Sequence, residues 1–179
     1  MANLMKNIKI DKLTMNIGAG KEQTILNKAI SVIKDITGKD PVKTVTNKRI
    51  ASWGLRTGLP IGCKLTLRKN DIPELLKRLL IAKDNILNVK SFDDHGNVSF
   101  GIKEHIDIPG TRYDPKIGIL GLQACITLSR PGFRIKKRKL NKARLGKNHK
   151  ISQQEAIDFM KTAYNIKIQE EIDAEEDNE

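Results

Sequence analysis

Aromatic residues are scarce in this chain of 179 amino acids, which has four Phe, two Tyr and one Trp. The interior must therefore consist mainly of Ile, Leu and Val, and Trp53 stands alone as a large flat side chain. With 39% apolar residues, a chain of this length can bury one hydrophobic core. We therefore expect one folded unit.

Cysteine is also rare, and its placement excludes several classes of site. Cys63 and Cys125 are too few for a disulfide framework, and neither has a metal-ligand spacing with His95, His105 or His149. No nucleophile or carboxylate pair accompanies the three histidines in a recognisable motif. We expect a reducing compartment, no metal, no cofactor and no enzymatic activity.

Long hydrophobic runs are missing as well. No apolar stretch approaches the length of a membrane span, and the first ten residues, MANLMKNIKI, lack the apolar segment of a signal peptide. The sequence therefore predicts a cytoplasmic protein that is not inserted into a membrane.

A glycine-rich turn, NIGAGKEQT, invites comparison with a phosphate-binding loop. The spacing fails, because Gly18 and Gly20 are two apart and Glu22 follows Lys21 where the motif needs Ser or Thr. We interpret the segment as a tight turn between a strand and a helix.

Acidic residues are absent from two long windows. Residues 41–70 hold seven Lys or Arg and residues 129–150 hold ten, with no Asp or Glu in either. Seven of the 21 acidic residues lie in the last eleven positions. The rest of the chain therefore has 33 basic and 14 acidic residues, a net charge of +19. Such a charge favours an anionic partner, either nucleic acid or an anionic membrane. The second window lacks the bulky apolar face of a membrane-binding helix, and a targeting signal or solvated tail would rarely interrupt a domain, so we favour RNA.

Hydrophobic periodicity predicts an α+β fold with a mostly antiparallel sheet, helices packed on one face, a long basic loop and a basic C-terminal arm. Alternation predicts strands at 12–17 and 61–68, and Val42 to Thr46 forms a shorter β-rich run. Helical spacing spans 25–36, where Gly38 can end the helix, and recurs at 75–80.

Capping pairs and alternation also predict the later elements. Asp71 with Glu74 resembles a helix-capping pair, as does Ser152 with Glu155 before a final helix at 152–164. Further strands are expected from Val98 to Ile106 and from Leu120 to Leu128. We expect one RNA-binding domain over 1–168, with the arm at 129–150, and a disordered acidic tail at 169–179.

Strand parity predicts that polar and cationic side chains share the uncovered face of the sheet. Thr14 and Asn16 lie on one strand, and Lys64, Thr66 and Arg68 on the other. Any one of these could be an ordinary solvated residue. Trp53, in the 47–60 loop between basic and glycine residues, strengthens the interpretation because an exposed ring can stack on an unpaired base.

Several motifs together resemble the universal large-subunit ribosomal protein five family, over about residues 13–168. The segments are MNIGAG, ITGKDPVKT, RTGLPIGCKLTLR, GNVSFGIKEH and IPGTRYDP. The continuation SRPGFRIKKRKL and the HKISQQEAIDFM helix are similar to the archaeal and eukaryotic branch.

The resemblance implies a structural constituent of the large, 50S-type subunit that binds 5S rRNA in the central protuberance and also meets large-subunit rRNA. In the family, an asparagine, a loop aromatic and a threonine contact 5S rRNA; these correspond to Asn16, Trp53 and Thr66. Some bacterial members use a glutamine at the position of Lys39. The rRNA-binding residues expected here are Thr14, Asn16, Lys39, Lys48, Arg49, Trp53, Lys64, Thr66, Arg68, Arg134, Lys136, Lys137 and Arg138.

Two further contacts are implied by the resemblance, and neither requires a homo-oligomer. The loop tip is similar to the part that approaches P-site tRNA, and comprises Arg56, Thr57, Gly58, Leu59 and Pro60. The second segment resembles the region that meets small-subunit protein thirteen in an intersubunit bridge, and comprises Pro109, Gly110, Thr111, Arg112, Tyr113, Asp114, Pro115 and Lys116. The alternative is an RNA chaperone or RNA-modifying enzyme using the same basic face.

Overall fold

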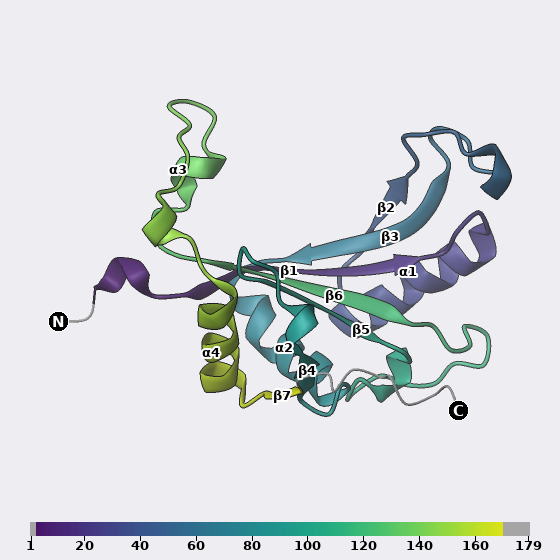
Figure 1. Ribbon diagram of the computed structural model, residues 1–179. Helices are drawn as coiled ribbons and strands as arrows, with labels where there is room; N and C mark the ends of the chain where they lie inside the picture. The colour runs from purple at the N-terminus through teal and green to yellow at the C-terminus, as the bar shows by residue number, and fades with distance from the viewer. Residues whose placement is uncertain (1–2, 170–179) are drawn as a thin grey trace, which may run out of the picture.

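A five-stranded antiparallel sheet is the centre of the protein in this computed structural model, which describes residues 3–169 (Figure 1). The strand order is β2-β3-β1-β6-β5. The strands are β1 (Lys9–Gly18), β2 (Val42–Val45), β3 (Pro60–Leu67), β5 (Asn97–Ile102) and β6 (Leu122–Ser129). The helices are α1 (Gln23–Thr37), α2 (Ile72–Ile81), α3 (Arg134–Lys137) and α4 (Gln153–Tyr164). The predicted α+β class is confirmed.

A second, two-stranded sheet was not predicted. It pairs β4 (Ile86–Asn88) with β7 (Lys167–Gln169) in parallel. Three-residue strands carry too little alternation to stand out in a sequence. Gln169, the first residue of the predicted acidic tail, ends β7, and the rest of that tail lies outside the described residues.

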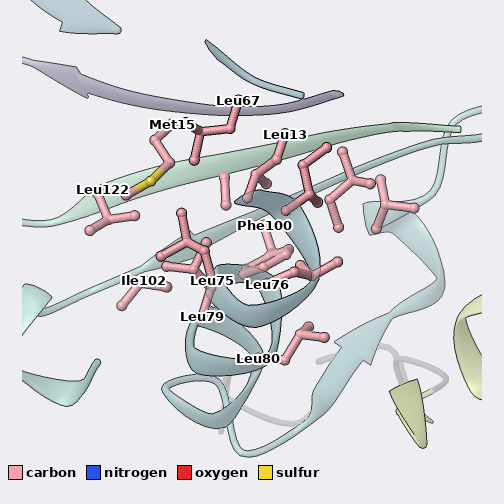
Figure 2. Close-up of a cluster of buried hydrophobic side chains, with 14 of the residues drawn as sticks. Leu13, Met15, Leu67, Leu75, Leu76, Leu79, Leu80, Phe100, Ile102 and Leu122 are labelled. Carbon is pink, nitrogen blue, oxygen red and sulfur yellow. The ribbon is translucent and has the colours of Figure 1, made fainter. Parts of the chain in front are cut away.

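The hydrophobic core lies between the sheet and its helices, and β1 shows how the sequence builds it. Leu13, Met15 and Ile17 are at most 2% exposed, whereas the intervening residues are partly exposed. Figure 2 shows Leu13 and Met15 of β1 on the side of the sheet that α2 covers. Each large apolar side chain buried in this way stabilises the fold by roughly 1.5–3 kcal/mol relative to exposure.

The first helix is confirmed, together with its ending. Its buried residues recur at helical spacing, from Leu26 to Ile36. Gly38 then adopts the left-handed conformation with φ of 68° and donates its N–H to the Lys34 carbonyl. A residue with a Cβ would be strained there, so glycine defines the helix end.

The capping role predicted for Asp71 is wrong. Asp71 has helical backbone angles, and its side chain makes no hydrogen bond to the first turn of α2. Its carboxylate instead accepts from Lys39 Nζ at 2.5 Å, across the gap between α1 and α2. A long-range ion pair has displaced the local cap, although α2 still buries Leu75, Leu76, Leu79 and Leu80 as predicted.

The predicted strand through Ile106 is too long, since β5 ends at Ile102. Continuing the pleat would have turned Glu104 into the core, where an unpaired carboxylate is costly. The chain leaves the sheet instead, and Glu104 is exposed. His105 is buried, and its Nδ1 accepts a hydrogen bond of 3.3 Å from the N–H of Leu120. This bond joins the two ends of the connection between β5 and β6. Leu120 therefore precedes β6, which begins at Leu122.

Candidate nucleic-acid interface

One face of the sheet carries a row of polar side chains predicted from strand parity. Lys64 of β3 pairs with Asn16 of β1, which pairs with Gln123 of β6. The Asn16 amide Nδ2 lies 3.4 Å from the Gln123 Oε1 acceptor. We call the surface that these side chains form on β3, β1 and β6 the open face.

The next row extends the same surface. Thr66 is opposite Thr14, with their hydroxyl oxygens 3.5 Å apart, and Thr14 is opposite Cys125. Arg68 follows Thr66 by two residues in extended backbone, so it continues the cationic edge of the face. Strand pairing therefore confirms that Thr14, Asn16, Lys64, Thr66 and Arg68 share one face of the sheet, as strand parity predicted. Neither row contains an acidic side chain.

Two projections rise on this side of the sheet, while α1, α2 and α4 lie on the other (Figure 1). The β2–β3 loop rises beside one end of the sheet, and the arm that contains α3 rises beside the other. Both belong to the windows without acidic residues. The open face therefore lies between two cationic segments.

The β2–β3 loop is a hydrogen-bonded structure. Ile50 and Leu55 exchange both backbone hydrogen bonds, at 3.1 and 3.0 Å, around a single 3-10 turn, Ala51–Trp53. At its base, Thr46 Oγ1 donates to the Arg56 carbonyl at 2.5 Å. The loop holds Trp53 68% exposed, which confirms that this ring is not a core residue.

Glycine at position 62 allows this loop to leave the sheet close to β1. A Cβ there would lie 2.7 Å from the Ile17 carbonyl oxygen and 3.0 Å from Thr44 Oγ1. The close approach brings β1, β2 and β3 together at the end of the sheet from which the loop rises. Lys21 lies near this loop, because its Cδ is 3.9 Å from the Cβ position of Gly54.

Other predicted rRNA-binding residues occupy separate places. Lys48 and Arg49 are exposed in the β2–β3 loop. Lys39 lies on the helical side, paired with Asp71, so the structure does not bring it to the open face. The tRNA-binding prediction, Arg56 to Pro60, covers the returning half of the loop and the first residue of β3.

Arg130 anchors the base of the arm, and sequence reasoning missed this role. It is 4% exposed and donates to the Lys6 carbonyl at 3.1 Å, the Lys150 carbonyl at 2.9 Å and Glu155 Oε1 at 2.6 Å. Arg130 thus joins the segment before β1, the end of the arm and the start of α4. Nothing in the sequence separates this arginine from its exposed neighbours in the arm.

The arm itself folds back on itself. The N–H of Ala143 donates to the Ile135 carbonyl at 3.3 Å, and Arg138 Nε donates to the Asn141 carbonyl at 2.7 Å. Lys137 forms an ion pair with Asp11 at the β1 bulge, which ties α3 to the sheet. Arg134, Lys136 and Arg138, three predicted rRNA-binding residues, remain exposed in the arm.

The connection between β5 and β6 carries the predicted bridge residues. Thr111 is fixed inward, because its hydroxyl oxygen lies 2.9 and 2.8 Å from the carbonyl oxygens of His105 and Ile108 and can donate its hydrogen to either. Tyr113 is 57% exposed, and the Asp114 carboxylate accepts from the N–H of Lys116 at 2.9 Å. The segment therefore presents an aromatic side chain on a hydrogen-bonded turn.

Gln123 and Cys125 were not singled out from the sequence, although both lie on the open face. The alternation that predicts Leu122, Ala124 and Ile126 as buried also predicts these residues as their outward partners, so the signal was present. Within residues 3–169, no group of three or more His, Cys, Asp or Glu side chains is placed to hold a metal ion. None of the described helices has the length and apolar character needed to cross a membrane.

Comparison with known proteins decides the family. The model for ribosomal protein L5 matches residues 3–56, and the model for the C-terminus of the same ribosomal family matches residues 60–159. The chain belongs to the ribosomal protein L5 family. This is a family of structural ribosomal proteins without enzymatic activity, which confirms the prediction that the chain is not an enzyme.

Archaeal members of the L5 family match nearly the whole chain. The large ribosomal subunit protein uL5 of Sulfolobus acidocaldarius is 48% identical, with 94% of each chain covered. The uL5 of Sulfurisphaera tokodaii is 45% identical over 94% of this chain and 96% of its own. The uL5 of Nitrosopumilus maritimus is 44% identical over 92% of this chain and 95% of its own. The resemblance found in the sequence motifs is confirmed.

Proposed function

We propose that this protein is a structural constituent of the large ribosomal subunit in the cytoplasm, and that its open face binds 5S rRNA. Family membership supports the ribosomal role. The finer assignment rests on one observation, the uncovered rows that place Asn16 beside Lys64 and Thr14 beside Thr66. Amide and hydroxyl groups flanked by cations suit contacts to ribose and phosphate.

Trp53 and the basic residues of its loop add a second kind of contact. The ring is 68% exposed on a hydrogen-bonded loop, so little conformational freedom is lost when a base stacks on it. Such stacking contributes roughly 1–3 kcal/mol per base. Lys48, Arg49 and the arm residues Arg134, Lys136, Lys137 and Arg138 supply charge toward 5S or large-subunit rRNA.

The test compares the salt dependence of 5S rRNA binding in three variants. Log affinity should fall linearly with log salt, and Lys64→Ala or Arg68→Ala should flatten that slope by about 0.7–0.9 for each phosphate that is no longer bound. Trp53→Ala should weaken binding about 5- to 150-fold and leave the slope unchanged, because stacking releases few counterions. Ile81→Ala, which removes an apolar side chain 52% exposed at the end of α2, is the matched control. Unchanged slopes in both cationic variants would refute the assignment of the open face.

We further propose that the loop tip, Arg56 to Pro60, contacts P-site tRNA. The support is its position on a projection from the sheet and the exposed Arg56 and Thr57 side chains between two hydrogen-bonded anchors. Arg56→Ala should reduce peptidyl-site tRNA affinity of assembled ribosomes without changing 5S rRNA affinity of the free protein. Loss of both affinities together would contradict a separate tRNA contact.

The segment from Pro109 to Lys116 is the proposed contact with small-subunit protein thirteen. Its support is the exposed ring of Tyr113 beside the exposed Arg112, on a turn held by Thr111. Tyr113→Ala should weaken association of the two subunits at low magnesium, whereas incorporation into the large subunit should remain normal. Normal subunit association would remove this residue from the bridge.

A further inference from the structure

A cavity of about 660 Å³ lies in the arm, separate from the rows of the open face. Three stretches of chain line it: Phe133 and Lys136 around α3, the returning segment from Lys142 to Leu145, and the segment that ends at Ile151. His95, on the turn before β5, completes the lining. The volume is within the range of about 300–1,000 Å³ typical of small-ligand sites.

The walls of this cavity are held in place by contacts at the arm's base. The rings of Phe133 and His149 meet edge to face, with centroids 5.6 Å apart and planes at 68°. His149 Nε2 lies 2.9 Å from the Pro131 carbonyl oxygen. On the other side, a Cβ at Gly96 would lie 2.7 Å from Ile151 Cγ2, so the turn that carries His95 packs directly on the arm.

The second wall is fixed by the fold of the arm. The backbone hydrogen bond from Ala143 to Ile135 holds the returning segment against the residues that follow Phe133. The cavity is therefore built from hydrogen-bonded and packed segments, with Arg130 buried beneath them.

The chemistry of the lining is divided into two kinds. Phe133, Ala143, Leu145 and Ile151 provide apolar surface. The cationic residues are Lys136, Lys142, Arg144, Lys147 and Lys150, and the lining contains no Asp or Glu. A ligand that suits both parts has an apolar, flat portion and one or more negative charges.

We propose that this cavity receives one unstacked nucleotide of RNA, with the base against Phe133 and Leu145 and the adjoining phosphates at the cationic rim. The inference rests on the proposed ribosomal function and adds a site to it. Proteins that read single-stranded RNA commonly place a splayed base on an aromatic ring and hold its phosphates with Lys or Arg. An inorganic anion would leave the apolar wall unused, and so would a peptide run made of Asp and Glu alone.

The position of the cavity favours RNA over an unrelated ligand. The arm and the β2–β3 loop project on the same side of the sheet, so an RNA molecule on the open face would also reach the arm (Figure 1). The exposed cations of the arm would draw the strand in, and the cavity would fix one nucleotide of it.

The test fills the cavity without changing its charge. Ala143 is exposed and lines the cavity, so Ala143→Phe should occupy it while keeping the backbone hydrogen bond to Ile135. The matched control is Leu140→Phe, which adds a ring to the same arm at a position 78% exposed and outside the cavity lining. Equal urea midpoints for both variants and the wild type would verify folding.

The full-length chain is titrated with a fluorescent ten-nucleotide oligoadenylate and with an RNA duplex of ten base pairs. Ala143→Phe should weaken binding of the single strand by about 5- to 150-fold, the range expected when one base no longer stacks. Its salt slope should be unchanged, and duplex affinity should stay within about twofold because paired bases cannot enter. Leu140→Phe should bind both RNAs as the wild type does. In a chain that already carries Trp53→Ala, Ala143→Phe should still lower the affinity for the single strand by the same factor. That result would separate binding in the cavity from stacking on the β2–β3 loop.

Other results would overturn the proposal. Equal single-strand affinity of Ala143→Phe and the wild type would show that no base enters the cavity. An equal loss of affinity for the duplex would indicate a general effect on the arm. Polyglutamate is titrated as a third ligand, and an equal loss of affinity for it would indicate an acidic protein partner instead. Each result can occur whether or not Lys64→Ala flattens the salt slope with 5S rRNA, so failure here is distinguishable from failure of the proposed function.

Discussion

The buried guanidinium of Arg130 donates to the carboxylate of Glu155 at 2.6 Å, and the same carboxylate accepts from the N–H of Ser152 at 3.0 Å. One acidic side chain therefore completes the capping box of α4 and holds the base of the arm. The orientation of the arm and the start of the last helix are coupled through this residue.

Replacing Arg130 should destabilise the whole protein. Arg130→Met removes hydrogen bonds to three backbone carbonyls and the ion pair with Glu155, and should lower the free energy of unfolding by about 2–4 kcal/mol. Arg134→Met, at an exposed position four residues later, should change it by less than about 0.5 kcal/mol. Urea denaturation measures both, and equal values for the two variants would contradict the anchoring role.

Glu155 should make stability depend on pH. The backbone hydrogen bond from Ser152, and then Arg130, hold the pKa of Glu155 below its usual value. Since the folded pKa is lower than the unfolded one, the contribution of Glu155 is complete above the unfolded pKa of about 4.3 and is lost as pH falls through the folded pKa.

The wild type should thus be more stable than Glu155→Gln by a constant margin at neutral pH, and this margin should shrink in acid below about pH 4.3. Urea denaturation of both proteins at a series of pH values measures the margin. A margin that does not change with pH would mean that the charge of Glu155 does not contribute.

Two glycines of the sheet should respond differently to the same substitution. Gly62→Ala places a Cβ against the Ile17 carbonyl oxygen and should cost about 1–3 kcal/mol of stability, because backbone cannot move aside as a flexible side chain can. Gly101 has no atom within 4 Å of its Cβ position and its φ is outside the left-handed region, so Gly101→Ala should be neutral or slightly stabilising. Thermal unfolding compares them, and similar losses for both would argue against the tight approach at Gly62.

The open face was predictable from sequence because alternation fixes which side chains share a side of a strand. Thr14 and Thr66 therefore meet as expected. Their pairing register could not be predicted, since it depends on the Gly18–Gly62 end of the two strands and on the path of the loop.

The features that the sequence did not predict share a physical cause. Asp71 and Arg130 have partners far away in the sequence, Lys39 and Glu155, and such contacts depend on the packed structure. Local patterns such as capping pairs and charge runs contain no information about them. The cavity of the arm was missed for the same reason, because its two walls meet only when Ala143 returns to Ile135.

Cys125 offers the most direct test of the open face as the 5S rRNA site. It is exposed in the row of Thr14 and Thr66, whereas Cys63 is buried, and that burial raises the pKa of the Cys63 thiol and suppresses its reactivity. The rate at which iodoacetamide alkylates Cys125 therefore reports on access to this face. A control chain, Cys125→Ser with Ser31→Cys, moves the reactive thiol to the exposed side of α1.

The measurement is the alkylation rate of each protein with and without saturating 5S rRNA. If RNA covers the open face, it should slow alkylation of Cys125 by about tenfold or more and leave the thiol at position 31 reacting at its free rate. An unchanged Cys125 rate in a complex shown to contain bound 5S rRNA would contradict the account.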